Sequence, residues 1–253
     1  MKKIFVIIII VGGLGTAAHF ARGPIREARF RVEQGPVPAA LPVEDVKKLE
    51  ATTTPATPVA STPKTSVTSF NLAVPFTSQA PFHIWDVDHE DFCEEASVAM
   101  VDAFYGKRTF TRESADQELF TIQSWEKENL GDWVSTTAEE TARILREKYG
   151  YKRVEVRYDV TVPDIEVEIR AGRPVIVGAD GKGLNPYFRN GGPIYHMLVI
   201  KGYTATRFVT NDPGIRRGAD YTYPKDFLFS KIHDWNNGDV PNGRRAMIVV
   251  YPN

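Results

Sequence analysis

The chain has 253 residues, of which 42% are hydrophobic and 25% are charged, and its formal net charge is −1. This composition is typical of one ordinary globular domain with additional segments. A charge so close to neutral gives no electrostatic reason to expect a nucleic-acid partner, and we expect none. Because Cys93 is the single cysteine, one chain can form neither an internal disulfide nor a thiolate-rich zinc site.

The first 21 residues predict export or membrane attachment. Two lysines precede an uninterrupted run of apolar or small residues from Ile4 to Ala18. That run has the length of a signal-peptide core and is shorter than the roughly 20 residues of a membrane span. We therefore expect a signal peptide or an N-terminal membrane anchor over residues 1–21, membrane contact through this segment alone, and an extracytoplasmic domain. Four arginines between residues 22 and 31 oppose this orientation, since positive charge favours the cytoplasmic side.

Residues 22–68 are expected to form a disordered linker. Proline, threonine, alanine and serine dominate from about residue 32, and large apolar side chains are too sparse to bury a core. The prolines favour a semi-extended chain. The globular domain is therefore expected over residues 69–253, and we expect it to be monomeric.

Helices are predicted in the first part of this domain. Apolar residues recur at spacings of three and four and predict a helix over residues 94–105, which Gly106 ends: Ala96, Ala99, Met100, Ala103 and Phe104. Residues 112–129 and 136–150 indicate two more helices. Thr137 and Glu140 form a capping-box pattern at the start of the second of these.

Short strands dominate the second part. They are predicted over residues 154–158, 173–179, 195–203, 207–212 and 245–251, with one short helix over 162–172. Because the strands do not alternate regularly with helices, a doubly wound parallel sheet is disfavoured. We predict an α+β domain in which a helical layer packs on an antiparallel sheet.

Cys93 is a candidate nucleophile because it lies at the start of the 94–105 helix. Unpaired backbone N–H groups and the helix dipole lower the pKa of a thiol there. Glu94 and Glu95 disfavour a thiolate, but we expect these carboxylates to be solvated and outweighed by a nearby base. The alternative is a buried structural cysteine.

His196 and Asp212 are candidate partners for this thiol. His196 opens an apolar strand after a glycine-rich loop, and Asp212 ends the next predicted strand. If the two strands form a hairpin across residues 204–206, Asp212 returns to the end of the sheet where His196 starts. Its carboxylate can there accept the Nδ1–H of His196 and hold the ring toward a thiol. The alternatives are a histidine bonded to backbone and an ordinary Asn-Asp-Pro-Gly turn.

Acyl transfer also requires hydrogen-bond donors for an oxyanion. The backbone N–H of Cys93 could supply one, and the side-chain amide of Gln79 is the candidate for the second. The alternative for Gln79 is a solvated loop residue.

Four motifs together resemble a known family: VPFTSQAPF, CEEASVAMV followed by Phe104-Tyr105-Gly106, GGPIYHMLVIKGY and NDPG. They are similar to the papain-fold cysteine peptidases, especially the bacteriocin leader peptidases and their free-standing, C39-like relatives. The resemblance covers about residues 70–253. It implies a papain-like α+β fold and hydrolysis of a peptide or protein substrate without a cofactor or a metal.

The resemblance also implies a role for each matching residue. Cys93 attacks the scissile carbonyl, His196 takes the thiol proton and later protonates the leaving amine, and Asp212 orients the imidazole. Gln79 stabilises the oxyanion. Glu94 departs from the small residue that many members carry after the cysteine.

Three other functions stay open. The first is metal binding, because the loop over residues 83–91 is rich in histidine and carboxylates. Its spacing matches neither a zincin helix nor an EF-hand, so we expect a solvated acidic loop. An inactive papain-fold module, tethered at the cell surface, could hold peptide or cell-wall material in the same cleft. The same triad could also transfer an acyl group to an amine instead of water.

Overall fold

The computed structural model describes residues 30, 32–42, 44–46 and 69–252. The chain divides into two units, residues 1–36 and 37–253. In the first unit, residues 30 and 32–34 are helical. The signal peptide or anchor expected over residues 1–21 lies outside the described residues. Within the described ranges, no helix is both long enough and apolar enough to span a bilayer.

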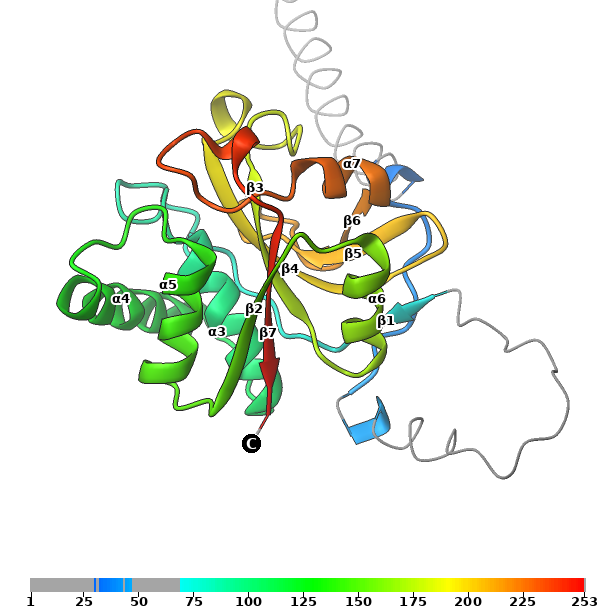
Figure 1. Ribbon diagram of the computed structural model, residues 1–253, viewed down its shortest axis with the longest axis horizontal. Helices are drawn as coiled ribbons and strands as arrows, with labels where there is room; N and C mark the ends of the chain where they lie inside the picture. The colour runs from blue at the N-terminus through cyan, green and yellow to red at the C-terminus, as the bar shows by residue number, and fades with distance from the viewer. Residues whose placement is uncertain (1–29, 31, 43, 47–68, 253) are drawn as a thin grey trace, which may run out of the picture. The chain divides into compact units, whose positions relative to one another are not determined.

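The second unit is built on a single antiparallel sheet, which has seven strands in the described part of the chain (Figure 1). Its order is β2-β7-β3-β4-β5-β6, and β1 pairs with the last residues of β4. The strands are β1 (Phe70–Asn71), β2 (Arg153–Tyr158), β3 (Val175–Asp180), β4 (Tyr195–Tyr203), β5 (Arg207–Asn211), β6 (Tyr221–Pro224) and β7 (Ala246–Tyr251).

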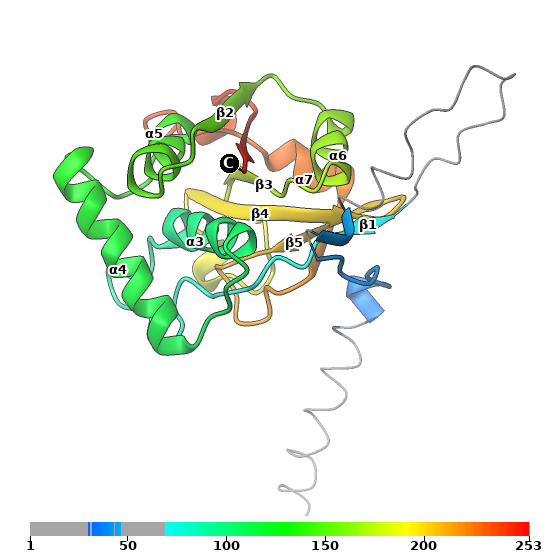
Figure 2. The same ribbon diagram turned by 90° about the horizontal axis from the view of Figure 1, so that it is seen from below.

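Helices cover both faces of this sheet. They are α3 (Cys93–Tyr105), α4 (Arg112–Asn129), α5 (Ala138–Arg143), α6 (Val162–Arg170) and α7 (Lys225–Lys231). Helix α3 packs against β4 with α4 beside it, while α6 and α7 lie on the opposite side of β4 (Figure 2). The predicted α+β architecture, with the helix of Cys93 packed on an antiparallel sheet, is confirmed.

Local signals in the sequence account for most element boundaries. The Thr137–Glu140 capping box is present, with Glu140 N donating to Thr137 Oγ1 at 3.2 Å and Thr137 N donating to Glu140 Oε2 at 2.8 Å. The helix that follows continues beyond α5 as one π-helical segment, Ile144–Lys148. The hairpin between β4 and β5 also forms as predicted, with Tyr203 opposite Phe208. Strand β6 and helix α7 were not predicted.

Helix α3 is buried on nearly every side. All of its predicted apolar positions are buried, and so are Glu94, Glu95 and Ser97. The expectation that Glu94 and Glu95 are solvated is wrong: their exposed fractions are 1% and 0%. The physical reason is that α3 lies between β4 and α4, so its first turn has no side that faces water.

Part of the segment expected as linker contacts the domain. Leu41 pairs with Leu72 in a parallel β-bridge, in which Leu41 N donates to Asn71 O and Ala73 N donates to Leu41 O, both at 2.9 Å. Val46 is 2% exposed and lies against the backbone of Gly172. Val46 therefore adds to the core of the second unit and Leu41 to its backbone pairing, although both precede the expected boundary at residue 69.

Candidate active site

Cys93 is the first residue of α3, and its neighbour Phe92 fixes the start of that helix. The Phe92 ring is fully buried and makes edge contacts with the rings of His89, Phe120 and Trp133, at centroid distances of 5.1–5.6 Å. Its carbonyl oxygen accepts the first helical hydrogen bond, from Ala96 N at 3.1 Å. This aromatic cluster holds the residue before Cys93 in place, so the thiol is carried on rigid scaffold.

The Cys93 thiol is buried and donates a hydrogen bond to a carboxylate. It is 5% exposed, and its Sγ donates to Oε2 of Glu94 at 2.8 Å. Burial, the charge of Glu94 and this hydrogen bond raise the pKa of the thiol well above its ordinary value, although the backbone N–H of Met197 acts in the opposite direction. The expectation of a lowered thiol pKa is therefore wrong for this resting arrangement, because Glu94 is buried beside the sulfur.

His196 and Asp212 are brought together as predicted, but the imidazole meets the aspartate through Nε2 and not through the expected Nδ1. Nε2 of His196 lies 2.8 Å from Oδ1 of Asp212, and both side chains are buried. Burial acts to raise the pKa of Asp212, but the charge of His196 and hydrogen bonds from His196, Tyr223 and Gly214 outweigh it, so the pKa falls below its usual value. Asp212 is therefore ionised at neutral pH and accepts the Nε2–H of the imidazole.

Two residues that the sequence did not single out complete the surroundings of Asp212. Nδ2 of Asn185 donates to Oδ2 of Asp212 at 3.1 Å and to the Tyr223 hydroxyl at 2.6 Å, and that hydroxyl also donates to Asp212. Asn185 lies in the glycine-rich loop before His196, and Tyr223 lies on the unpredicted strand β6. A polar residue in that loop was visible in the sequence, but no spacing pattern linked it to Asp212.

The imidazole of His196 is held from two further sides. The ring of Phe188 meets it edge to face at a centroid distance of 4.9 Å. A Cβ on Gly214 would lie 2.8 Å from Cε1 of His196, so only glycine allows the backbone this close to the ring. Within the described residues, Nδ1 of His196 has no hydrogen-bond partner, and no hydrogen bond joins Cys93 to His196. The sulfur nevertheless lies beside Met197, the residue that follows His196.

Gln79 is buried, which excludes the solvated alternative, but its amide is engaged elsewhere. Nε2 donates to the carbonyl oxygens of His89 at 2.9 Å and Glu90 at 3.0 Å. Its own backbone N donates to Pro213 O at 3.0 Å, which ties it to the turn after Asp212. In this arrangement, both amide protons of Gln79 stabilise the loop before α3.

Interactions with other elements fix that loop, residues 83–91. His89 is buried between Asp86 and Asp116 of α4, with ring nitrogens 2.6 and 2.9 Å from their carboxylates. An exposed ion pair at 3.2 Å joins Glu90 to Arg189 of the loop before β4. Among the described residues, no group of three or more histidine, cysteine, aspartate or glutamate side chains is arranged to hold a metal ion. The histidine and carboxylates of this loop are therefore used mainly in holding its shape.

A pair of carboxyl side chains is buried beside α3. Glu95 of α3 and Glu126 of α4 interact, and their oxygens have no conventional hydrogen-bond donor in the described part of the chain. Burial and neighbouring negative charge raise the pKa of Glu126 to about 8 and that of Glu95 well above its usual value. At neutral pH the pair therefore holds at least one proton, which one carboxyl can share with the other.

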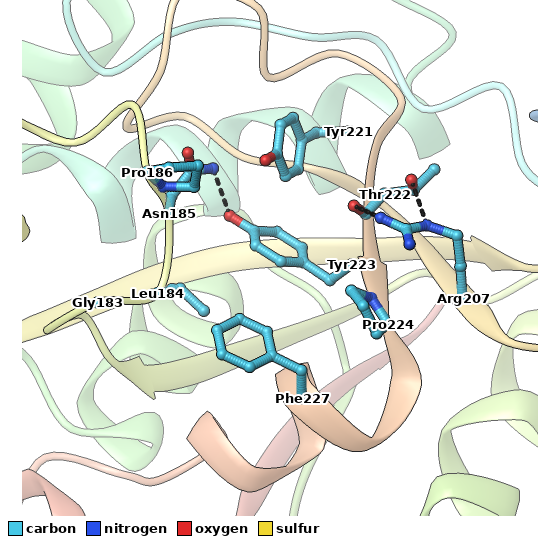
Figure 3. A pocket seen from close by; sticks show the side chains of 10 residues that line it. All are labelled: Gly183, Leu184, Asn185, Pro186, Arg207, Tyr221, Thr222, Tyr223, Pro224 and Phe227. Carbon is cyan, nitrogen blue, oxygen red and sulfur yellow. Dashed lines mark hydrogen bonds between the residues drawn. The ribbon is translucent and has the colours of Figure 1, made fainter. Parts of the chain in front are cut away.

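A pocket of about 340 Å³ lies between the loop that contains Asn185, strand β6 and Phe227 of α7 (Figure 3). Asn185 and Tyr223 line it and are hydrogen-bonded to each other there, while both also bond Asp212. Cys93 and His196 are absent from its lining. The pocket therefore adjoins the residues that hold Asp212 and is not the space in front of the sulfur.

Comparison with known proteins assigns the family. Residues 71–237, more than half of the chain, match the peptidase C39-like family. The chain belongs to the peptidase C39-like family. The crystal structure of a Bacillus anthracis protein, provisionally named a C39-like peptidase, is similar with a TM-score of 0.49 and 14% identity, covering 72% of this chain and 96% of that chain. No curated protein gives a significant match.

The matched region of this C39-like chain contains every candidate residue, because Gln79, Cys93, His196 and Asp212 all lie within residues 71–237. Together, the family and the observed α+β fold indicate a cysteine peptidase.

Proposed function

We propose that this protein hydrolyses peptide bonds with Cys93 as nucleophile, His196 as proton carrier and Asp212 as the residue that orients the imidazole. The observation that carries the proposal is the buried 2.8 Å contact between His196 and Asp212, at the beginning of β4 and beside the start of α3. The substrate is proposed to be a peptide or protein outside the cytoplasm, the compartment that the N-terminal segment predicts.

The tautomer of His196 supports this assignment of roles. The ionised Asp212 accepts Nε2–H, which leaves the lone pair of Nδ1 available as a base. Nδ1 takes the proton of the Cys93 thiol, and the resulting thiolate attacks the scissile carbonyl. An acyl-enzyme forms as the amine leaves with that proton from the imidazole. The same base then activates a water molecule, which hydrolyses the thioester and restores the free thiol.

The proposed oxyanion donors are the backbone N–H of Cys93 and the amide of Gln79. A backbone N–H in the first turn of a helix has no intrahelical partner, so that of Cys93 is free of the α3 ladder. The role of Gln79 requires its amide to leave the carbonyls of His89 and Glu90 during the reaction.

A second candidate function is supported by the state of the thiol. The Cys93 thiol is buried, is hydrogen-bonded to Glu94 and has a raised pKa. This state suits a papain-fold module that binds peptide or cell-wall material without cleaving it. Acyl transfer to an amine uses the same residues as hydrolysis and differs only in the final acceptor.

Labelling with a thiol-reactive peptide electrophile tests the proposal, with the Cys93→Ala variant as the control. Stoichiometric labelling at Cys93, together with cleavage of a peptide library by the wild type alone, is the expected result. Cleavage that survives in Cys93→Ala, or no labelling of the wild type, would overturn it. Added amines distinguish hydrolysis from transfer by the mass of the product.

A further inference from the structure

The pocket between the Asn185 loop, β6 and α7 combines a mostly apolar lining with one positive charge. Its volume is about 340 Å³, and Arg207 is the only charged residue among those that line it. The rings of Tyr221, Tyr223 and Phe227 contribute to its walls. In Figure 3 these rings lie between Asn185 on one side and Arg207 on the other. A volume of this size, with apolar walls and a few polar groups, is typical of sites for small ligands.

Arg207 has no acidic partner in the described part of the chain. Its Nε donates to Oγ1 of Thr222 and its Nη2 to the carbonyl oxygen of Thr222, both at 2.8 Å. Burial lowers the pKa of the guanidinium, and among the titratable groups of the described chain Tyr221 alone acts to raise it. The two bonds to Thr222 occupy one side of the guanidinium. Its end, formed by Nη1 and Nη2, therefore keeps N–H groups that two carboxylate oxygens can accept.

We propose that this pocket binds a free carboxylate that is attached to an aromatic ring or to a comparably large apolar group. The carboxylate accepts hydrogen bonds from Nη1 and Nη2 of Arg207, and the apolar group packs against the rings of Tyr221 and Phe227. A guanidinium and a carboxylate bond in a fixed, planar geometry, so the pair also orients the ligand. The C-terminal residue of a peptide and a small aromatic acid both supply this chemistry.

The charge and exposure of the lining favour such a ligand over others. A neutral ligand would cover the guanidinium end of Arg207 without giving it a hydrogen-bond partner, which costs free energy. A cationic ligand would meet a like charge, because no carboxylate lines the pocket. The ring of Phe227 is 38% exposed, so a ligand with an apolar group gains burial there. Neither Cys93 nor His196 lines the pocket, and the inference is therefore independent of the proposed hydrolysis.

Isothermal titration calorimetry of the full chain at pH 7 tests the proposal. The probe is N-acetyl-Gly-Phe, and its C-terminal amide is the control ligand. The acid should bind at one site per chain, and the amide about tenfold more weakly or less, because it offers Arg207 no charge. A third ligand, 3-phenylpropionate, has the ring and the carboxylate without a peptide group. If it binds as tightly as the peptide, a small acid is sufficient; if the peptide binds more tightly, a peptide C-terminus is the source.

Two variants of the lining assign the binding to this pocket. Arg207→Gln should weaken binding of the acid about tenfold or more and leave binding of the amide unchanged. Phe227→Ala should weaken binding of both ligands about fivefold, because it removes apolar contact from a ring that is not part of the core. Arg112→Gln is the matched control. It removes the same charge from an exposed position at the start of α4 and should bind the acid as the wild type does.

The outcomes that overturn the proposal are specific. They are absence of binding of the acid, equal affinity of the wild type for acid and amide, or undiminished binding in a folded Arg207→Gln. The comparison of the two ligands uses the wild type alone and decides even where Arg207→Gln does not fold. Cys93→Ala should bind the acid normally, and loss of binding there would place the ligand at the sulfur instead. Labelling of Cys93 is a separate measurement, so failure of the proposed function leaves this result unchanged.

Discussion

Nε2 of His196 lies 2.8 Å from Oδ1 of Asp212, although the two residues belong to different strands of one hairpin: His196 lies near the start of β4, and Asp212 directly follows β5. Asp212 also accepts hydrogen bonds from Asn185, Tyr223 and the backbone N–H of Gly214. The aspartate is therefore held from several directions, and among the candidate catalytic groups it contacts the imidazole of His196. Changes at Asp212 should alter turnover more than folding.

Asp212→Asn should lower kcat on a peptide substrate by on the order of a thousandfold to ten-thousandfold, because the amide favours the wrong imidazole tautomer. Circular dichroism should show an unchanged fold. Asp226→Asn, on an exposed position of α7, is the matched control and should retain full activity. Near-normal turnover of Asp212→Asn would show that the aspartate has no part in the reaction.

Tyr223→Phe removes one hydrogen bond to Asp212 and should reduce kcat about fivefold to tenfold, as expected for about 1 kcal/mol. The Tyr223 hydroxyl helps to keep the pKa of Asp212 low, so its loss should raise that pKa. The acid limb of the activity profile should then move to higher pH, since Asp212 becomes protonated earlier on acidification. Tyr221→Phe, which removes the neighbouring hydroxyl on the same strand, should leave the limb in place.

Gln79→Ala separates two roles of the amide. If Gln79 mainly holds the carbonyls of His89 and Glu90, amide hydrogen exchange in residues 83–91 should become faster. If the amide also stabilises the oxyanion, kcat should fall about a hundredfold with little change in KM. Gln123→Ala is the control, because it loosens the same loop at Asp88 without touching the reacting groups. Equal losses of kcat in both variants would assign the effect to the loop alone.

The buried pair Glu95–Glu126 should make the protein less stable at pH 8 than at pH 5. Burial raises the pKa of Glu126 to about 8, whereas the same group has an ordinary value of 4.5 in the unfolded chain. Between these values the folded state holds a proton that the unfolded state has lost, so the free energy of unfolding falls as pH rises through this window. Urea denaturation at the two pH values measures the difference.

Glu126→Gln should flatten this pH dependence and stabilise the protein at pH 8 by on the order of 2 kcal/mol, with little effect at pH 5. Glu128→Gln, on the exposed side of the same helix, is the control and should change neither value. An unchanged slope in Glu126→Gln would mean that the pair does not hold the extra proton.

Val46→Ala should lower the free energy of unfolding of the full chain by about 1–2 kcal/mol, because two buried methyl groups are lost against Gly172. Val32→Ala removes the same atoms from a side chain that is 81% exposed and should have almost no effect. Equal effects of the two substitutions would contradict a docked segment around Val46.

The sequence predicted the features that depend on local pattern and chain order. The helix that begins at Cys93, the hairpin that returns Asp212 to His196, and the Thr137 capping box all follow from spacing within a few residues. The surroundings of these side chains depend on segments far away in the chain. Acidic residues in a first helical turn are usually solvated, and only the packing of α4 and β4 around α3 buries Glu94 and Glu95.

The same limit applies to Gln79 and to the residues around Asp212. Whether an amide donates to an oxyanion or to nearby carbonyls is decided by side-chain rotation, which leaves no periodic signal in the sequence. Asn185 and Tyr223 reach Asp212 from two other segments, so only the assembled sheet reveals them.

Strand β4 sets the distance between the two ends of this domain. His196 lies at its beginning, while Tyr203 at its end pairs with Phe70, beside the residues to which Leu41 is bonded. At about 3.3 Å per residue, roughly 23 Å separates the imidazole from the place where the preceding chain joins the sheet. The candidate nucleophile, which lies beside Met197, is therefore carried at the opposite end of β4 from the residues that Leu41 joins.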